Sequence, residues 1–262
     1  MNLESLRVEL QKPRRHKDSL YGRWVMRRLS IYVTAVLGLL PVSPFAINLA
    51  SIIAGLIGAW LVASRHWVSG ILMINLWYLL DHVDGELARY RRVFCATGLF
   101  FDSMANVIVI PAAFAASGFA LAHGGPNGLK WFFVGLTAGY GSMMMFVVPY
   151  CEAAVILQRF HQGRLQLNAA TVTPGMTASQ PSQSFFKKIF SILHETATFP
   201  VFLPAATACV LISAIIGGSF AEKALGILLV VYAVLTTAIW VAVTAHTVLT
   251  LKIDRKHPLI PQ

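Results

Sequence analysis

Long uninterrupted apolar runs constrain this chain more than any other feature of its sequence. A helix needs about 20 apolar residues to cross the ~30 Å hydrocarbon core of a bilayer. Six runs of about that length cover residues 45–64, 67–84, 97–122, 131–157, 199–217 and 224–250. Of the 262 residues, 56% are hydrophobic and only 12% are charged, whereas soluble domains carry about 25% charged residues. The sequence therefore predicts an all-α integral membrane protein with six transmembrane helices, and it excludes ordinary soluble, disordered and disulfide-stapled classes.

The segment before the first run is basic and amphipathic. Leu20, Trp24 and Leu29 recur at roughly helical spacing among basic residues. Such a helix lies in the membrane interface, with its apolar face toward the acyl chains and its Arg residues among lipid phosphates. We therefore expect an N-terminal amphipathic interfacial helix. The expected organisation is a cytosolic and interfacial segment over 1–44, a six-span membrane domain over 45–250 and a cytosolic tail over 251–262.

The basic residues predict the orientation of the chain. All but three of the 21 Lys and Arg residues lie in the N-terminal segment, the 85–96 loop, the 158–198 loop or the C-terminal tail. The exceptions, Arg65, Lys130 and Lys223, lie in the opposite connections. Because cytosolic loops are enriched in Lys and Arg, we expect both termini in the cytosol. The net charge of +10 then belongs to a collar that faces anionic headgroups, and no nucleic-acid partner is expected.

The scarce acids are concentrated in one window. Asp81, Asp84 and Asp102 are three of only five Asp residues in the chain. Asp81 and Asp84 share one helix face, and Asp102 and Asn106 share a face of the next helix. A short cytosolic loop joins these helices, so both polar faces meet near the cytosolic boundary. Crowded carboxylates at the edge of a low-dielectric medium favour a bound cation, and ligation by oxygen alone favours Mg²⁺, Mn²⁺ or Ca²⁺ over Zn²⁺.

Small residues flank these acids. Gly85 and Ala88 leave room for a ligand to approach the backbone, and Gly98 does the same on the facing helix. Arg89 follows directly and could hold an acid in place or face a phosphate.

This window resembles the signature of the CDP-alcohol phosphotransferase family, D-x-x-D-G-x-x-A-R-x8-G-x3-D-x3-D. The positions that match in residue and spacing are Asp81, Asp84, Gly85, Ala88, Arg89, Gly98 and Asp102. The segment from Ser43 to Asn48 loosely resembles the Pro-Asn-x-Ile-Thr entry of that family into its first span. The resemblance implies a membrane enzyme that moves a substituted phosphoryl group from a CDP-linked donor, such as CDP-diacylglycerol, to an alcohol hydroxyl and releases CMP.

The resemblance also implies the partners and the roles of residues. Two divalent cations, Mg²⁺ or Mn²⁺, are expected on Asp81, Asp84, Asp102 and Asn106. The CDP-linked donor is expected beside Asp81, Asp84, Gly85, Ala88, Arg89 and Gly98. A small alcohol or polyol phosphate would arrive from the cytosol, and weaker candidates for its site are Arg91, Arg92, Arg159, Arg164 and Glu152. The family further implies a homodimer with its active site at the cytosolic face, and Glu86 within the motif loosely resembles the branch that handles inositol phosphates.

The sequence departs from the family pattern at Asn106. The family has a fourth Asp there, which is thought to deprotonate the acceptor hydroxyl and to help ligate the second metal. An amide oxygen can ligate a hard cation but cannot act as a general base near neutral pH. Three explanations are open: an engineered inactive variant, a natural member that uses Glu152, His194 or Glu195 as its base, and a relative that binds without turnover.

Two other interpretations of the acid cluster use the same residues. A cation-coupled transporter needs polar residues that continue through the far half of the bundle. The second run offers only Ser69 and Asn75 for this, and the third mainly Ser103, Asn106 and Ser117, so no continuous path is evident. A buried polar network that only stabilises a helix pair is the other alternative. The three cysteines, Cys95, Cys151 and Cys209, lack metal-ligand spacing and are expected to be unpaired packing residues.

Overall fold

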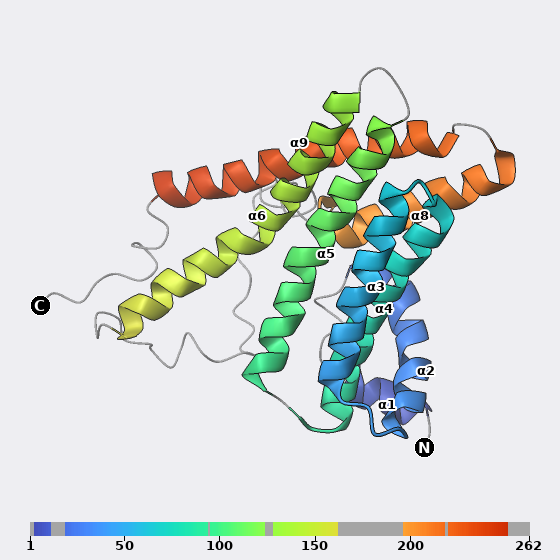
Figure 1. Cartoon of the computed structure of the whole chain (residues 1–262). Helices are drawn as coiled ribbons and strands as arrows, with labels where there is room; N and C mark the ends of the chain where they lie inside the picture. The colour runs from blue at the N-terminus through green and yellow to red at the C-terminus, as the bar shows by residue number, and fades with distance from the viewer. Residues whose placement is uncertain are drawn as a thin grey trace, which may run out of the picture.

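The computed structural model describes residues 3–11, 19–93, 95–123, 128–161, 196–217 and 220–250. Within these ranges the chain is helical and contains no strand (Figure 1). Its helices are α1 (Leu3–Leu10), η2 (Gly22–Met26), α2 (Arg27–Gly38), α3 (Pro44–Ala63), α4 (Trp67–Tyr90), α5 (Ala96–Ala122), α6 (Gly128–His161), α8 (Phe199–Ile216) and α9 (Phe220–Leu249).

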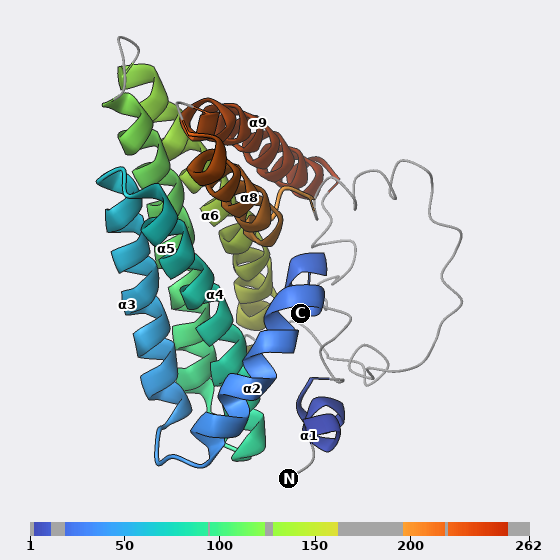
Figure 2. The same cartoon turned by 90° about the vertical axis from the view of Figure 1, so that its right-hand side faces the viewer.

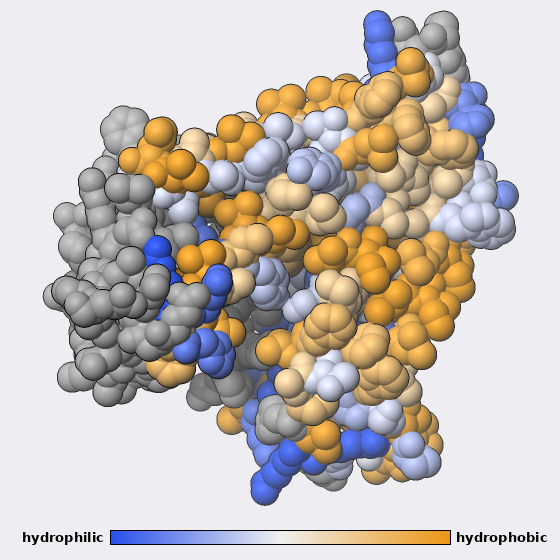
Figure 3. All heavy atoms as spheres, turned by 60° about the vertical axis from the view of Figure 1, so that its left-hand side comes forward, coloured by the Kyte–Doolittle hydropathy of each residue, from blue (hydrophilic) through white to orange (hydrophobic). Residues whose placement is uncertain are grey.

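Five of these helices are long and apolar enough to cross a membrane, namely α3, α5, α6, α8 and α9. Figure 3 shows the matching surface, on which hydrophobic residues cover a broad area between hydrophilic ones at opposite ends. The prediction of an all-α, multi-pass membrane protein is confirmed in this form. The second predicted run coincides with α4, which has 24 residues but is not among the five. Its polar residues, Asn75, Asp81, His82 and Asp84, lower its hydropathy, and the count of six stays a prediction.

Helix α3 packs against both α4 and α5 (Figure 1). Glycines let the backbones approach closely, as small residues do in membrane helix pairs. A Cβ at Gly58 of α3 would lie 3.0 Å from the carbonyl oxygen of Gly70 in α4. A Cβ at Gly118 of α5 would lie 2.6 Å from the carbonyl oxygen of Trp131 in α6. The position of each helix relative to its neighbour therefore depends on the absence of a single methyl group.

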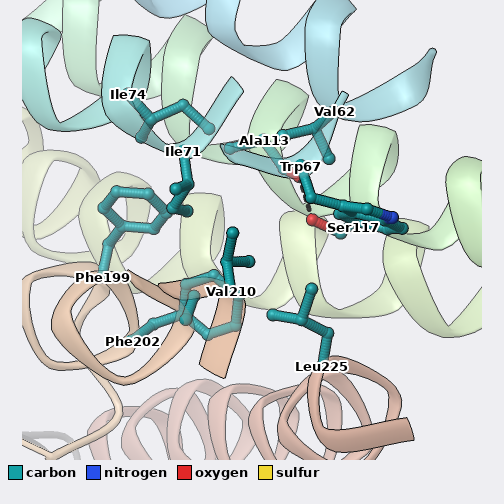
Figure 4. A pocket seen from close by; sticks show the side chains of 11 residues that line it. Val62, Trp67, Ile71, Ile74, Ala113, Ser117, Phe199, Phe202, Val210 and Leu225 are labelled. Atoms are coloured by element: carbon teal, nitrogen blue, oxygen red, sulfur yellow. Dashed lines mark hydrogen bonds between the residues drawn. The ribbon is translucent and has the colours of Figure 1, made fainter. Parts of the chain in front are cut away.

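An aromatic core joins α4 and α5 to α8 and α9. Trp77, Phe114 and Phe199 are buried, and the ring of Phe199 lies 5.6 Å from both other rings in edge-on contact. Beside this core is a small pocket with an almost wholly apolar lining (Figure 4). Its free volume of about 10 Å³ is at the lower limit for one water molecule. The hydroxyl of Ser117 in its wall already donates to the Ala113 carbonyl, 2.8 Å away, so the pocket is a packing void rather than a ligand site.

The N-terminal helices pack against the C-terminal half of α4. Helix α2 lies along α4, and α1 contacts both (Figure 2). Helix α2, with 12 residues, follows η2 without a break, so residues 20–38 form one continuous helical segment beside α4. Residues 12–18, which belong to the predicted interfacial helix, lie outside the described part of the chain.

Candidate active site

Three helix ends meet at one end of the bundle: the start of α3, the end of α4 and the start of α5. Ser43 caps α3, and its Oγ accepts a hydrogen bond from the Ala46 amide at 3.1 Å, with Pro44 at the first helical position. Cys95 caps α5, because its Sγ accepts from the Gly98 amide at 3.3 Å. The cysteine is free and exposed. The prediction that Cys95 is unpaired is confirmed, whereas the prediction that it packs in the interior is wrong, because it is exposed and caps a helix.

The turn between α4 and α5 brings the two polar faces together. Arg92 adopts a left-handed conformation with φ of 55°. Its amide donates to the Arg89 carbonyl, and the Val93 amide donates to the Ala88 carbonyl at 3.0 Å. These two bonds form a Schellman motif, which ends α4 and reverses the chain within a few residues. Asp102 on α5 thereby faces the acidic end of α4.

The three helix ends enclose a cavity of about 680 Å³, which is within the usual range for small-molecule sites. Its lining combines six of the seven motif positions with residues of α3 and of the α4–α5 turn. These residues are Ser43, Pro44, Phe45, Asn48, Asp84, Gly85, Ala88, Arg89, Val93, Cys95, Ala96, Thr97, Gly98, Leu99, Phe101 and Asp102. Asp81 and Asn106 are not part of that lining.

Asp84 is the buried acid of the cavity, and Asn48 holds it. Only 8% of the Asp84 surface is exposed, and its Oδ2 accepts a hydrogen bond of 2.6 Å from the Asn48 Nδ2. Asn48 ends the segment that loosely resembles the entry of the family into its first span, but the sequence alone indicates no role for it. A polar residue near the start of an apolar run was the available signal.

Asp81 and Asp102 complete the acidic group. Asp81 interacts electrostatically with both Asp84 and Asp102, and its Oδ1 is buried with no hydrogen-bond donor among the described residues. The Oδ1 of Asn48 is likewise buried without a donor. Buried oxygens without donors, beside three carboxylates, are a donor set that fits a hard divalent cation. In the described part of the chain, however, no three His, Cys, Asp or Glu side chains are gathered tightly enough to hold an ion as they stand.

Asn106 lies one turn beyond Asp102 and is hydrogen-bonded within α5. Its Nδ2 donates to the Asp102 carbonyl at 2.9 Å. An ionised Asp has no hydrogen to donate, so an acid at this position would be repelled by that carbonyl and would turn elsewhere. The amide therefore changes both the charge of the group and the direction of the side chain.

Arg89 lies between the cavity and the N-terminal helix. Its Nε donates to the Leu10 carbonyl of α1 at 2.7 Å. A Cβ built on Gly85 would lie 3.5 Å from the Arg89 Nη1, so the guanidinium covers Gly85 at the cavity wall. Glu86, next to Gly85, is fully buried and accepts hydrogen bonds from Gln11, which follows α1, and from α2 instead.

The weaker acceptor candidates are not among the residues that line the cavity. Arg91 donates to the carbonyls of Leu37 and Leu40 at the end of α2. Glu152 of α6 accepts a 2.7 Å hydrogen bond from Thr247 of α9, and Arg159 lies near the end of α6. Figure 1 shows α6 diverging from α5 toward this end. Arg164, His194 and Glu195 lie outside the described residues, so their roles stay predictions.

Comparison with known proteins agrees with the motif and the fold. The family model described as CDP-alcohol phosphatidyltransferase matches residues 42–251. Two solved structures of Mycobacterium tuberculosis phosphatidylinositol phosphate synthase (PgsA1) share the fold. The apo form has a TM-score of 0.55 at 15% identity and covers 86% of this chain and 96% of its own. The form with CDP-DAG bound also has a TM-score of 0.55, at 16% identity, and covers 88% of this chain and 96% of its own.

No curated protein matches the sequence. The family match extends over most of the chain, from the α3 N-cap region to the end of α9, and it includes the whole signature from Asp81 to Asp102. The chain belongs to the CDP-alcohol phosphatidyltransferase family.

Proposed function

We propose that this protein is a phospholipid-biosynthetic transferase that takes a phosphatidyl-type group from a CDP-linked lipid and moves it to the hydroxyl of a small alcohol or polyol, with release of CMP. One observation carries the proposal. Asp84, Gly85, Ala88, Arg89, Gly98 and Asp102, separated along the sequence, line one cavity at the meeting point of three helix ends. Residues of the family signature thus share one cavity, which supports a common ligand for them.

The chemistry of the cavity wall supports a lipid donor such as CDP-diacylglycerol. Phe45 and Phe101 meet edge-to-face in the wall, with ring centroids 4.9 Å apart, and Leu99 is 63% exposed beside them. These apolar side chains suit acyl chains or a nucleobase, whereas Arg89 suits a diphosphate. The solved relative with CDP-DAG bound supports the same donor class. The volume leaves room for a nucleotide headgroup with its diphosphate.

We propose that Asp81, Asp84 and Asp102, with the amide oxygen of Asn106, hold two divalent cations, Mg²⁺ or Mn²⁺. Such ions neutralise the charge that develops on a transferring phosphoryl group and orient an in-line attack. The buried Asp81 Oδ1 and Asn48 Oδ1, which lack donors among the described residues, support this assignment. Asn48 orients Asp84 by its short hydrogen bond.

Asn106 limits the proposed reaction. Its amide can orient an acceptor hydroxyl by accepting a hydrogen bond, but it cannot take the proton as the hydroxyl attacks the phosphorus. Glu152, the alternative base within the described chain, is bonded to Thr247 and is not in the cavity lining. We therefore propose that this sequence binds its donor well and turns it over slowly.

We further propose that α4 is the sixth span and that both termini and the cavity face the cytosol. The length of α4 supports a span, since its 24 residues extend about 36 Å. The distribution of basic residues supports the orientation. The N-terminal basic segment would then lie in the interface. A homodimer, expected from the family resemblance, stays part of the proposal.

The decisive experiment measures CMP release from CDP-diacylglycerol by the purified protein and by Asn106→Asp, with Mg²⁺ or Mn²⁺ and a panel of alcohols. We expect Asn106→Asp to release CMP about 10²–10⁴-fold faster, because it restores a general base. Chelation with EDTA should abolish release, and added metal should restore it. The control is Asp102→Asn introduced into Asn106→Asp, which should be inactive.

Two results would refute the proposal. One is the absence of both donor binding and CMP release in either protein, with every donor and acceptor tested. The other is cation uptake into proteoliposomes without any turnover of a cytidine nucleotide, which would establish a transporter that uses the same acids.

A further inference from the structure

We propose that Glu86 is a positioning residue, which clamps the N-terminal helix α1 against α4 and thereby fixes the guanidinium of Arg89 at the donor cavity. The inference deepens the proposed function and rests on it, because the group that Arg89 would meet is the diphosphate of the donor.

The carboxylate of Glu86 is fully buried and surrounded by donors from the N-terminal segment. Its Oε1 accepts hydrogen bonds from Gln11 Nε2 at 2.8 Å and from Ser30 Oγ at 2.7 Å. Its Oε2 accepts from Thr34 Oγ1 at 2.8 Å, and the Arg27 Nη1 lies 3.9 Å from Oε1. A buried carboxylate is stable only with such a set of partners. Removal of the acid would leave several of these donors without an acceptor.

Gln11 connects the clamp to α1. This residue follows the last turn of α1, and its Nε2 bonds both to Glu86 and to the Arg27 carbonyl at 2.7 Å. Leu10, immediately before it, is 1% exposed and packs with Leu6 and Ile31 in a small core of its own. The end of α1 is therefore fixed by a polar bond on one side and by apolar packing on the other.

The same end of α1 holds Arg89. The last carbonyls of a helix lack intrahelical partners and carry partial negative charge, so they attract a cationic donor. The Leu10 carbonyl accepts from the Arg89 Nε at 2.7 Å, one turn of α4 beyond Glu86. Leu10 thus binds Arg89 while the adjacent Gln11 binds Glu86. Because Leu10 and Gln11 are consecutive residues, a shift in one of these contacts also shifts the other.

These two contacts determine the orientation of the Arg89 guanidinium at the cavity. With its Nε bonded to α1, the plane of the guanidinium is fixed, and its Nη groups lie over Gly85 beside Asp84. Planar, fixed Nη groups are the form in which arginine recognises phosphate oxygens. All residues that supply the clamp to Glu86 precede position 42, where the family match begins. A segment outside the matched domain therefore holds Arg89 in the wall of the donor cavity, although the clamp residues themselves do not line it.

The test is a double-mutant cycle on donor binding by the full-length protein in lipid nanodiscs with Mg²⁺. The probe is CDP-diacylglycerol, and the variants are Glu86→Gln, Arg89→Ala and both together. Glu86→Gln keeps the shape of the side chain and removes its charge. We expect it to raise the Kd for the donor about tenfold in the unsubstituted background and less than about twofold when Arg89 is already Ala, since coupled residues are not additive.

The matched control is Glu9→Gln, the same chemical change on the exposed side of α1, which should leave the Kd unchanged. If Glu86→Gln does not fold, Gln11→Ala takes its place in the cycle, because it removes one donor and keeps the carboxylate. An equal increase in Kd with and without Arg89 would show a merely structural role and overturn the proposal. An unchanged Kd in Glu86→Gln would also overturn it. Failure of the unsubstituted protein to bind the donor would instead refute the proposed function itself.

Discussion

The buried hydrogen bond between Asn48 and Asp84 is the residue-scale feature on which the candidate site most depends. It joins α3 to α4 at the base of the cavity, over 2.6 Å, between two residues that are 5% and 8% exposed. A carboxylate in such surroundings is destabilised unless a donor or a cation faces it. Asn48 supplies that donor to one oxygen of Asp84 and leaves its own Oδ1 directed into buried space.

Asn48→Ala should therefore destabilise the protein by about 1–3 kcal/mol, because it removes the only side-chain donor that the described residues show for the buried Asp84 carboxylate, which keeps the Gly85 amide and the nearby Arg89. Thermal unfolding in detergent without divalent metal measures the change. Ser51→Ala is the control, since the Ser51 hydroxyl donates only to the Asn48 carbonyl, which also belongs to the helix ladder. Equal losses in the two variants would contradict the importance of the Asn48–Asp84 pair.

Gly85→Ala should weaken donor binding without lowering the thermal stability of the protein. A Cβ at Gly85 meets nothing closer than the Arg89 Nη1 at 3.5 Å, which is an ordinary contact, and Ala stabilises a helix by about 0.5–1 kcal/mol relative to Gly. The methyl group would, however, press on the Arg89 guanidinium at the cavity wall, which the donor must contact. We expect unchanged or higher thermal stability together with a Kd for CDP-diacylglycerol raised about tenfold. Donor affinity equal to that of the unsubstituted protein would show that the ligand does not approach Gly85.

At the scale of elements, backbone contacts between glycines set the relative positions of α5 and α6. Gly118 and Gly135 face each other across this pair, and a Cβ on either would lie within 2.8 Å of the other's Cα. A methyl group at either position would force the two backbones apart. Because Asp102 and Asn106 belong to α5, a shift of this helix would also reach the site.

Gly118→Ala should lower the free energy of unfolding by about 1–3 kcal/mol through this overpacking. Thermal or denaturant unfolding in detergent micelles tests the expectation. Gly85→Ala, the same substitution at an open position of α4, is the matched control. A Gly118→Ala protein as stable as that control would show that the α5–α6 contact is looser than described.

The C-terminal end of α4 differs from the end of the apolar run that predicts this helix. The second apolar run ends at residue 84, yet α4 continues to Tyr90. Apolarity measures the part of a helix that lies in the hydrocarbon, whereas Glu86, Leu87 and Ala88 are good helix formers that extend it beyond that part. The helix ends only where Arg92 takes the left-handed conformation. The first part of the motif, from Asp81 to Arg89, therefore lies on one continuous helix, whose two faces have different surroundings.

At the scale of the whole molecule, the proposed orientation can be tested with the native cysteines. Cys95 is exposed at the turn that carries the motif. In a protein with Cys151 and Cys209 replaced by Ala, a membrane-impermeant maleimide should label Cys95 only from the cytosolic side of oriented vesicles. Lys223→Cys in a protein that also lacks Cys95 should be labelled only from the opposite side. Labelling of both positions from the same side would refute the proposed topology.

The sequence alone determined the all-α membrane class and the acidic motif, because both depend on residues close together along the chain: apolar runs long enough to span, and acids spaced for one helix face. Tertiary structure decided what surrounds those acids. Asn48 reaches Asp84 from α3, 36 residues away, and Gln11, which follows α1, reaches Glu86 across 75 residues. Packing also explains why the neighbouring residues Gly85 and Glu86 differ: Gly85 lines the cavity, whereas Glu86 is buried against the N-terminal helices. Helical periodicity gives the direction of a side chain around its own axis, but only packing decides whether a cavity or another helix lies there.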